Sequence, residues 1–561
     1  MVCSEARAQT PVWEHQFPDL TPVAGAVERP VGIGTSEQHV LVAGTKYITS
    51  TTSVMSLVLY DFFSCTSGCT GGPPSGVSAT GKVLAEAQFP ITANKAIREA
   101  KVVAFSTGNS IYVQAFIAGT EAKSNGDLRV VVAAFHTNVL TMPTSLALTW
   151  SASETLPGAA TGTNEVPVGI AILTTSPTNI TPAYVAVVSE ATGYGNGKDM
   201  NVRVYDASTG AKIMDQYWTS SGTADDVPIG VALEYSSSSS GANVLVGVTT
   251  PVSGSSPPRT QAVVLGWRAE SNYLPGTNLP TGTAMTGSPL TLSQTSTQSD
   301  VLKAVTPQSG PQVSPNVIAF AAHRTDTGTS PVKQDFLTWV MLITPSGGAA
   351  ISDSLAEMWN QTYDDLTPGS GEDVDIPVAL AVFDISPGGT ITSGFRIAVT
   401  GTTRTQSGTT TDIATVCYKV STQSLMWWAH YDNSNNGSNT DNNDYPTSMS
   451  YVAFTSEDKR LFIAGATDKV GGTGTPNYDY LSFYYDPADS GAIPRPHGWL
   501  PDGSIPALPW SGGSADGFDE ATSITARIMY IGGNQYNGIF KTGRSDHPTD
   551  AFDWVTTRIT P

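Results

Sequence analysis

The feature that most constrains the fold is a segment that recurs about every 70 residues along the chain. Each copy places an acidic residue directly before a short apolar run, as in Glu165-Val-Pro-Val-Gly-Ile-Ala-Ile. The eight copies start near Glu28, Glu99, Glu165, Asp226, Asp300, Asp375, Asp444 and Asp519. One structural unit is therefore repeated eight times.

Within each copy the pattern predicts four short β-strands. The apolar run is the first, and a β-branched run that often ends in glycine is the second, as in Val40-Leu-Val-Ala-Gly44. A second series of acidic residues opens the third strand: Asp127, Asp199, Asp335, Asp412, Asp479 and Asp553. The fourth strand carries tryptophan, at Trp150, Trp218, Trp359, Trp427 and Trp428. Four strands with alternating polarity and turns between them are typical of a propeller blade.

The two ends of the sequence complement each other. The last copy reaches its third strand, Asp553-Trp-Val-Thr-Thr-Arg-Ile, and no fourth follows. Val12-Trp13-Glu-His-Gln-Phe17 has the pattern of a strand that precedes the first copy. We therefore expect residues 11–18 to complete blade eight, because an open edge would be an aggregation hazard. The prediction is an all-β chain in which residues 11–561 form a single eight-bladed β-propeller, with four antiparallel strands per blade.

The length and the charge of the chain limit the number of domains and the kinds of partner. At about 150 residues per domain, 561 residues suggest several domains, but the repeat favours one ring. Charged residues make up 14% of the chain and the net charge is −20. Nucleic acids and anionic membrane surfaces are polyanions, so this balance argues against both as partners. No apolar run approaches about 18 residues, which argues against membrane insertion.

Several features favour an extracellular or cell-surface location, with the periplasm as an alternative. Residues 1–10 contain Ala6-Arg7-Ala8, which indicates either a signal-peptide remnant or an ordinary polar N-terminus. Cys65 and Cys69 lie in a Gly/Pro/Ser-rich loop, where a local disulfide competes with two free thiols. Candidate glycosylation sequons, which a chain rich in Asn, Ser and Thr also contains by chance, begin at Asn179, Asn360 and Asn436.

The recurring carboxylates are the first candidate site. Around an axial channel they could bind cations or polarise a substrate. The alternative is structural, because an acidic residue before a strand accepts hydrogen bonds from backbone N–H groups of its turn. A catalytic group is needed once, so eightfold recurrence favours the structural interpretation, and the second acidic series is interpreted in the same way. The clear copies of this structural acidic repeat are those at Glu165, Asp226, Asp375, Asp444 and Asp519.

A second candidate is a weak calcium loop. Asp432, Ser434 and Asn436, with Gly437 next, follow the first half of a calcium-loop spacing. Asn443 stands where the bidentate glutamate is needed, so a solvated loop is the alternative. No other cofactor is indicated, since HxH, HExxH, GxSxG and P-loop patterns are absent. Trp499 and Trp510, outside the repeat positions, suit either sugar stacking or packing onto the propeller.

Two families resemble parts of this chain. The segment from Tyr205 through Asp-Ala-Ser-Thr-Gly to Trp218 is similar to a blade of the bacterial seven-bladed-propeller repeat family, as is Phe462-Ile-Ala-Gly-Ala-Thr467 running to Asp479. That resemblance implies a secreted or surface propeller without an assigned activity, although this chain has eight copies. The same Asp206–Gly210 segment resembles the docking segment of quinoprotein dehydrogenases, with a stretched spacing to Trp218 and without their vicinal cysteine pair.

These observations favour a secreted or cell-surface, non-enzymatic propeller. It would act as a structural, adhesive or interaction module whose partners are surface glycans or further copies of itself. A strand that closes its own ring could instead complete a neighbour's, which would give fibres by strand addition. The alternative is a carbohydrate-active lyase or hydrolase with its site at the channel mouth. A quinoprotein dehydrogenase is the third hypothesis.

Overall fold

The computed structural model describes the strands and many of their connections. The described residues are 11–17, 29–36, 39–49, 52–61, 79–80, 83–89, 95–107, 110–138, 146–154, 162–174, 181–193, 197–220, 225–235, 241–270, 283–307, 316–329, 332–344, 353–363, 374–385, 394–404, 411–431, 443–453, 459–468, 478–487, 519–531, 534–547 and 551–559. All regular secondary structure in these ranges is β-strand, which confirms the all-β prediction. Nor do they contain a helix long and apolar enough to span a membrane.

The strands form eight separate sheets, numbered here in chain order. Sheet 1 contains β2 (Arg29–Ser36), β3 (His39–Thr49), β4 (Thr52–Asp61) and β6 (Val83–Gln88). Sheet 2 contains β7 (Lys95–Thr107), β8 (Ser110–Ala122), β9 (Leu128–Asn138) and β10 (Ala147–Glu154). Sheet 3 contains β11 (Asn164–Thr174), β12 (Pro182–Thr192), β13 (Lys198–Asp206) and β14 (Lys212–Trp218). Sheet 4 contains β15 (Val227–Tyr235), β16 (Gly241–Pro251), β17 (Thr260–Glu270), β18 (Thr283–Ala284) and β19 (Leu290–Thr291).

The second half of the chain continues the pattern. Sheet 5 contains β20 (Gln298–Pro307), β21 (Asn316–Asp326), β22 (Lys333–Thr344) and β23 (Ser354–Tyr363). Sheet 6 contains β24 (Ile376–Asp384), β25 (Phe395–Arg404), β26 (Thr411–Lys419) and β27 (Leu425–Tyr431). Sheet 7 contains, within the described residues, β28 (Asp444–Ala453), β29 (Lys459–Asp468) and β30 (Tyr478–Tyr485). Sheet 8 contains β31 (Asp519–Ile531), β32 (Asn534–His547), β33 (Ala551–Ile559), β1 (Pro11–Phe17) and β5 (Ala79–Thr80).

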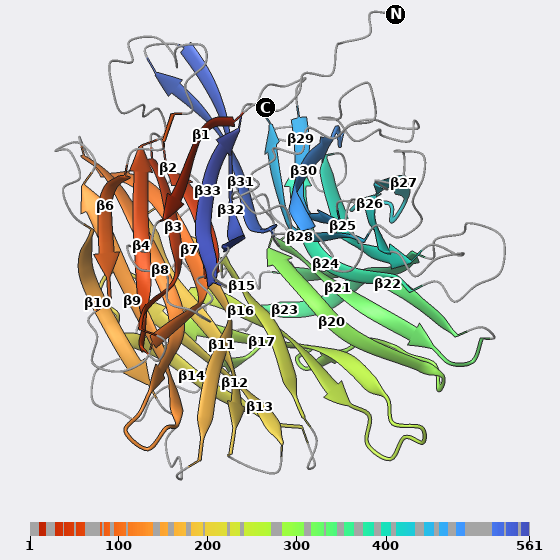
Figure 1. Ribbon diagram of the computed structural model, residues 1–561. Coiled ribbons are helices and arrows are strands. Elements are labelled where there is room, and N and C mark those ends of the chain that lie inside the picture. Colours follow the sequence, from red (N-terminus) through yellow and green to blue (C-terminus); the bar gives the residue numbers. More distant parts are fainter. Residues whose placement is uncertain are drawn as a thin grey trace, which may run out of the picture.

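Sheet 8 joins the two ends of the chain. β1 pairs antiparallel with β33, from Pro11 opposite Ile559 to Phe17 opposite Trp554. The other edge of β1 pairs in parallel with β5, where Trp13 lies opposite Ala79. In Figure 1 the dark red β1 accordingly lies beside the blue β33.

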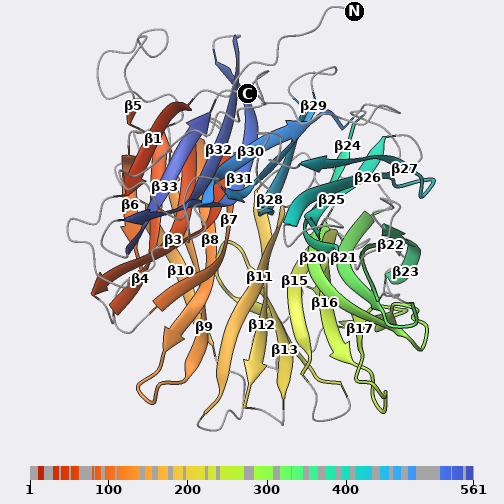
Figure 2. The ribbon, with the colours of Figure 1, turned by 45° about the vertical axis from the view of Figure 1, so that its right-hand side comes forward.

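The first strands of the sheets contact one another in succession. These contacts join β2 to β7, β7 to β11, β11 to β15, β15 to β20, β20 to β24, β24 to β28 and β28 to β31. β31 in turn contacts β2 of sheet 1. Figures 1 and 2 show the same succession in the colours of the chain, from red through green to blue.

Each of the eight first strands contains a register shift at the same place in its repeat. The shifts lie between Pro30/Gly32, Ile97/Glu99, Pro167/Gly169, Pro228/Gly230, Leu302/Ala304, Pro377/Ala379, Pro446/Ser448 and Ala521/Ser523. Except for Glu99, the residue after the shift is Gly, Ala or Ser. A Cβ atom on Gly169 would lie 2.8 Å from the Gly230 Cα atom, so a small residue allows neighbouring first strands to approach closely.

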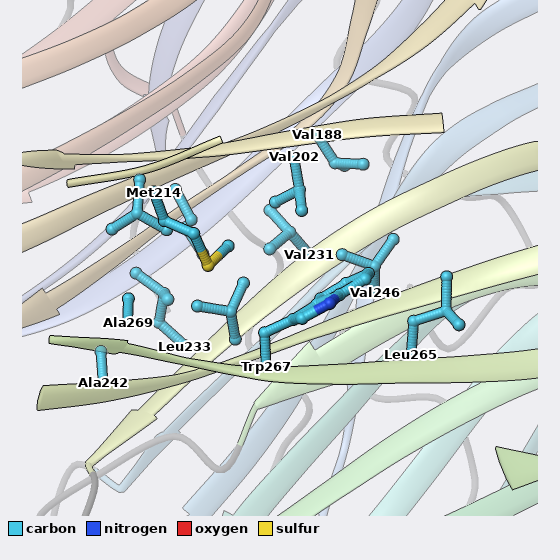
Figure 3. Close-up of a cluster of buried hydrophobic side chains, with 14 of the residues drawn as sticks. Val188, Val202, Met214, Val231, Leu233, Ala242, Val246, Leu265, Trp267 and Ala269 are labelled. Carbon is cyan, nitrogen blue, oxygen red and sulfur yellow. The ribbon is translucent and has the colours of Figure 1, made fainter. Parts of the chain in front are cut away.

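The hydrophobic core lies between facing sheets. Figure 3 shows the cluster between sheets 3 and 4, where Met214 and Val202 meet Leu233, Val246 and Trp267. Middle strands are buried along nearly their whole length: seven consecutive residues of β26, from Asp412 to Tyr418, are buried. A strand with sheets packed on both faces needs apolar side chains on both, which explains the low charge content.

Candidate functional site

The recurring carboxylates lie at separate joints, where a joint is the region in which one sheet packs against the next. The side chains described among them are Glu165, Asp226, Asp300, Asp375 and Asp444, and each is at most 1% exposed. Each register shift leaves one residue of the first strand without a partner, and the carboxylate lies three positions before that residue. Within the described part of the chain, no three His, Cys, Asp or Glu side chains are grouped closely enough to hold a metal ion. These five residues belong to the first strands of five different sheets or directly precede them.

Glu165 begins a chain of alternating charges that is buried at Glu165 and Arg203 and partly exposed at Lys212 and Glu154. Arg203 Nη2 donates to Glu165 Oε1 at 3.0 Å and to Oε2 at 3.2 Å. Arg203 Nε lies 3.5 Å from Asp215 Oδ1, and Lys212 Nζ lies 2.9 Å from Asp215 Oδ2. Lys212 Nζ also lies 3.1 Å from Glu154 Oε2 in sheet 2. The chain of charges thus runs from β11 of sheet 3 to β10 of the preceding sheet.

The charge on Arg203 is stabilised by this surrounding. Its side chain is 2% exposed, and that burial by itself disfavours the guanidinium charge. The nearby carboxylates, Glu165 foremost, outweigh burial and raise the pKa of Arg203 above its ordinary value. Burial also raises the pKa of the neighbouring Tyr205, whose phenol stays protonated. The network therefore depends on all its charged members being present together.

Asp300 has an arginine partner as well, but the arginine comes from a different strand. Arg324 of β21 donates through Nε to Oδ1 at 2.8 Å and through Nη2 to Oδ2 at 2.9 Å. Gln294, in the segment that follows β19 of sheet 4, donates to Oδ2 at 2.8 Å. Asp300 thereby forms a bidentate pair with Arg324 within sheet 5, the strong geometry for a buried charge, and the Gln294 bond connects it to sheet 4.

Asp226 is bonded to backbone instead. The Ser220 N–H group, which follows β14 of sheet 3, donates to Asp226 Oδ2 at 2.5 Å. The Asp226 N–H group donates to the Lys198 carbonyl oxygen at 2.6 Å. This is the backbone-capping geometry expected for a carboxylate before a strand. The same position of the repeat thus uses two different kinds of partner.

The register of sheet 2 corrects the start of the second copy. The shift between Ile97 and Glu99 aligns Glu99 with Gly169 of sheet 3, and it aligns Lys95 with Glu165. A lysine therefore occupies the position that carries a carboxylate in the other copies. This copy has Ile97 where most copies have proline, so its start is not recognisable from the sequence, and Glu99 does not mark it. Glu28 lies outside the described residues, and of Asp519 only the backbone is described, at the start of β31.

Sequence reasoning missed the residue directly before the carboxylate. In four copies its side chain accepts a hydrogen bond from the backbone N–H group that opens the third strand of the preceding sheet. The pairs are Leu128 to Asn164 (2.8 Å), Lys198 to Asp225 (2.9 Å), Thr260 to Ser299 (3.0 Å) and Thr411 to Asn443 (3.1 Å). The recurrence of Asn, Asp or Ser at this position was the signal available in the sequence.

Two of the repeated tryptophans of the fourth strands donate a hydrogen bond to the next sheet. Trp150 Nε1 donates to the Ala207 carbonyl oxygen at 2.9 Å, and Trp359 Nε1 donates to that of Val420 at 2.7 Å. The indole of Trp150 covers Gly210 so closely that a Cβ atom there would lie 2.6 Å away. The Asp206–Gly210 turn, which resembles a quinoprotein docking segment, thus receives the tryptophan of the preceding sheet. Packing between sheets accounts for this segment, which provides no argument for a quinone site.

Hydrogen bonds also fix the conformation of this turn. Asp206 Oδ1 accepts from the Ser208 and Thr209 N–H groups at 3.0 and 2.8 Å, and from both hydroxyls. Burial opposes ionisation of Asp206, but these donors outweigh it and lower its pKa. Gly210 follows with φ of 71°, a conformation that favours glycine.

Several predicted sites lie outside the described residues. These are the calcium candidates Asp432, Ser434 and Asn436, the cysteines Cys65 and Cys69, the sequon at Asn179, and both Trp499 and Trp510. Asn360 is described: it lies half-buried on β23, and its amide donates to Glu357 Oε1 at 2.8 Å. Asn443, at the last position of the calcium spacing, bonds to Thr411 as described above. Calcium binding, the disulfide and glycosylation stay predictions.

Comparisons with known proteins identify no family. No protein-family profile matches the chain, and no curated protein is significantly similar in sequence. Quinohaemoprotein alcohol dehydrogenases from Comamonas testosteroni and Pseudomonas putida HK5 are similar over 98% of this chain and 76% of theirs, with 9% and 8% identity and TM-scores of 0.44 and 0.40. A GH32 β-fructofuranosidase from Bombyx mori is similar over 98% of this chain and 91% of its own, with 9% identity and a TM-score of 0.28. These neighbours are propeller-type proteins with many small antiparallel sheets, but likenesses this weak assign neither a family nor an activity.

Proposed function

We propose that the eight sheets are the blades of one closed propeller. Two observations support this arrangement. The contacts between first strands pass from β2 through the seven following sheets and return from β31 to β2. β1 and β33, from opposite ends of the chain, lie in one sheet, so opening the ring would require breaking a strand ladder.

We further propose that this propeller is a secreted or cell-surface module with a structural, adhesive or interaction role rather than an enzyme. The observation that carries the proposal is the use of the recurring carboxylates. They are buried, and Glu165 and Asp300 pair with arginine whereas Asp226 accepts from backbone. These carboxylates thus stabilise the fold, within a sheet through the arginine pairs and between sheets through the bonds from Ser220 and Gln294. Its partners would be surface glycans or further copies of itself, assembled into fibres by strand addition.

The test combines imaging with an activity screen. Electron microscopy of the purified protein over a range of concentrations should show eight-segmented rings and, at high concentration, end-to-end chains of them. Isolated monomers at every concentration would contradict assembly. In parallel, turnover of an acidic or neutral polysaccharide by the folded protein would contradict the non-enzymatic role and favour the lyase or hydrolase alternative. A quinone chromophore after reconstitution would favour the dehydrogenase.

A further inference from the structure

The strand β1 occupies a slot between two strands that come from distant parts of the chain. On one side, β33 pairs with it at six positions between Pro11 and Phe17. On the other side, β5 pairs with it at two positions, Trp13 opposite Ala79 and Glu14 opposite Thr80. β1 is therefore an interior strand of sheet 8, although it is the first strand of the chain.

β5 belongs to a different sheet by its connections. It lies between β4 and β6 in the sequence, and both of these are strands of sheet 1. β5 thus reaches from sheet 1 to cover the edge of β1, an edge that would otherwise present unpaired backbone groups. To leave the slot, β1 must break its hydrogen bonds on both sides.

We propose that β5 is a clasp that controls the exchange of β1 between two copies of this chain. With the clasp in place, β1 closes its own ring. When β5 releases its edge, β1 can leave, and the vacated slot beside β33 accepts β1 of a second copy. This inference rests on the proposed assembly by strand addition and names the strand that is exchanged, the slot that receives it and the element that regulates the step.

The geometry supports a second copy as the occupant. The slot already matches the register of this strand, and exchange recreates the same hydrogen bonds between chains, which makes it a low-cost route to oligomers. The eleven residues between β1 and β2 could span at most about 40 Å if fully extended. The pairing with β5 is much shorter than that with β33, so weakening β5 should free β1 while most of the slot stays intact.

The experiment uses the full chain with a cysteine pair that reports on the slot. Glu14 and Thr557 are register partners, so Glu14→Cys with Thr557→Cys forms a disulfide within one copy when β1 pairs with β33 of its own chain. Equal amounts of ¹⁴N and ¹⁵N protein are mixed before oxidation, and mass spectrometry identifies the 14–557 cross-linked peptide. A peptide with both isotopes comes from a strand exchanged between copies. A peptide with one isotope comes from an unexchanged strand or from exchange between two copies with the same label.

The clasp is tested by adding Ala79→Pro and Thr80→Pro to this background. Proline removes a backbone N–H group, so the pair removes whichever one faces β1. The matched control is Thr283→Pro with Ala284→Pro in β18, another two-residue outer strand, which pairs with β17. We expect the share of mixed-isotope peptide to rise at least threefold in the β5 variant and to stay at the parental level in the β18 variant. Thr80→Gly, which is milder, should raise it by less.

The outcomes separate the clasp from the assembly. Mixed peptide in the parent that does not increase in either β5 variant would overturn the clasp and leave strand addition standing. Single-isotope peptide alone, in the parent and in all β5 variants, would overturn both. If the proline variant does not fold, the Thr80→Gly variant decides by the same comparison.

Discussion

Glu165 and Asp226 occupy the same position in consecutive copies, yet they are held in different ways. Glu165 pairs with the buried Arg203 and begins a chain of charges that reaches Glu154 of the preceding sheet. Asp226 accepts instead from a backbone donor, the Ser220 N–H group. The repeat therefore determines where a carboxylate is buried, whereas the strands around it determine its partner. A charged joint should be more sensitive to losing one member than a backbone-capped joint.

The largest effect is expected from Glu165→Gln. This change leaves the charge of Arg203 buried without its main counter-ion, at a cost of about 3–5 kcal/mol in the free energy of unfolding. Denaturant unfolding followed by tryptophan fluorescence measures the change. Replacing Arg203 as well, by Met, should recover most of the loss, because no uncompensated charge then remains. A loss below about 1 kcal/mol for the single variant would show that the pair does not hold this joint.

A smaller effect is expected from Asp226→Ala. The Ser220 N–H group loses its acceptor, which costs about 1–3 kcal/mol. Asp226→Asn keeps an acceptor oxygen and serves as the control, with most of the stability retained. If Asp226→Ala proved as costly as Glu165→Gln, the distinction between charged and backbone-capped joints would be wrong.

The region in which sheets 6 and 7 pack together is apolar and contains Cys417, so we expect its contribution to the free energy of unfolding to fall at alkaline pH. Burial of the Cys417 thiol raises its pKa to about 12, from 9.0. Because the folded-state pKa is raised, the stabilisation is complete below pH 9 and is lost as the pH rises towards 12. By pH 10 this loss reaches about 1.4 kcal/mol. A Cys417→Ala variant should lack this component when unfolding is measured at both pH values, and an unchanged pH dependence would contradict it.

The smallest effect is expected at the tryptophan contact between sheets 2 and 3. Trp150→Phe keeps an aromatic ring near Tyr205 but removes the hydrogen bond to the Ala207 carbonyl, at a cost of about 1 kcal/mol. Trp218→Phe is the control, because Trp218 is only partly buried. Equal losses in the two variants would argue against a specific role for the Trp150 hydrogen bond.

Sequence periodicity was sufficient for the all-β class and for most strands, because these follow from local patterns. It was insufficient for partners, since Arg203 is separated from Glu165 by two strand connections and nothing near either residue indicates the pair. It also misplaced the second copy, where Lys95 and Ile97 replace the usual acidic residue and proline. The bonds from Asn164 and Asp225 to the preceding sheet were missed because each joins neighbouring copies rather than residues within one.

The proposed propeller is one ring that β1 closes by pairing with β33. Hydrogen exchange of the backbone amides of residues 12–17 in β1, followed by mass spectrometry, tests it directly. A closed ring predicts that these amides are strongly protected, because β1 is paired on both sides within sheet 8. Rapid exchange in β1 while β33 and β12 stay protected would contradict closure of the ring by the N-terminal strand.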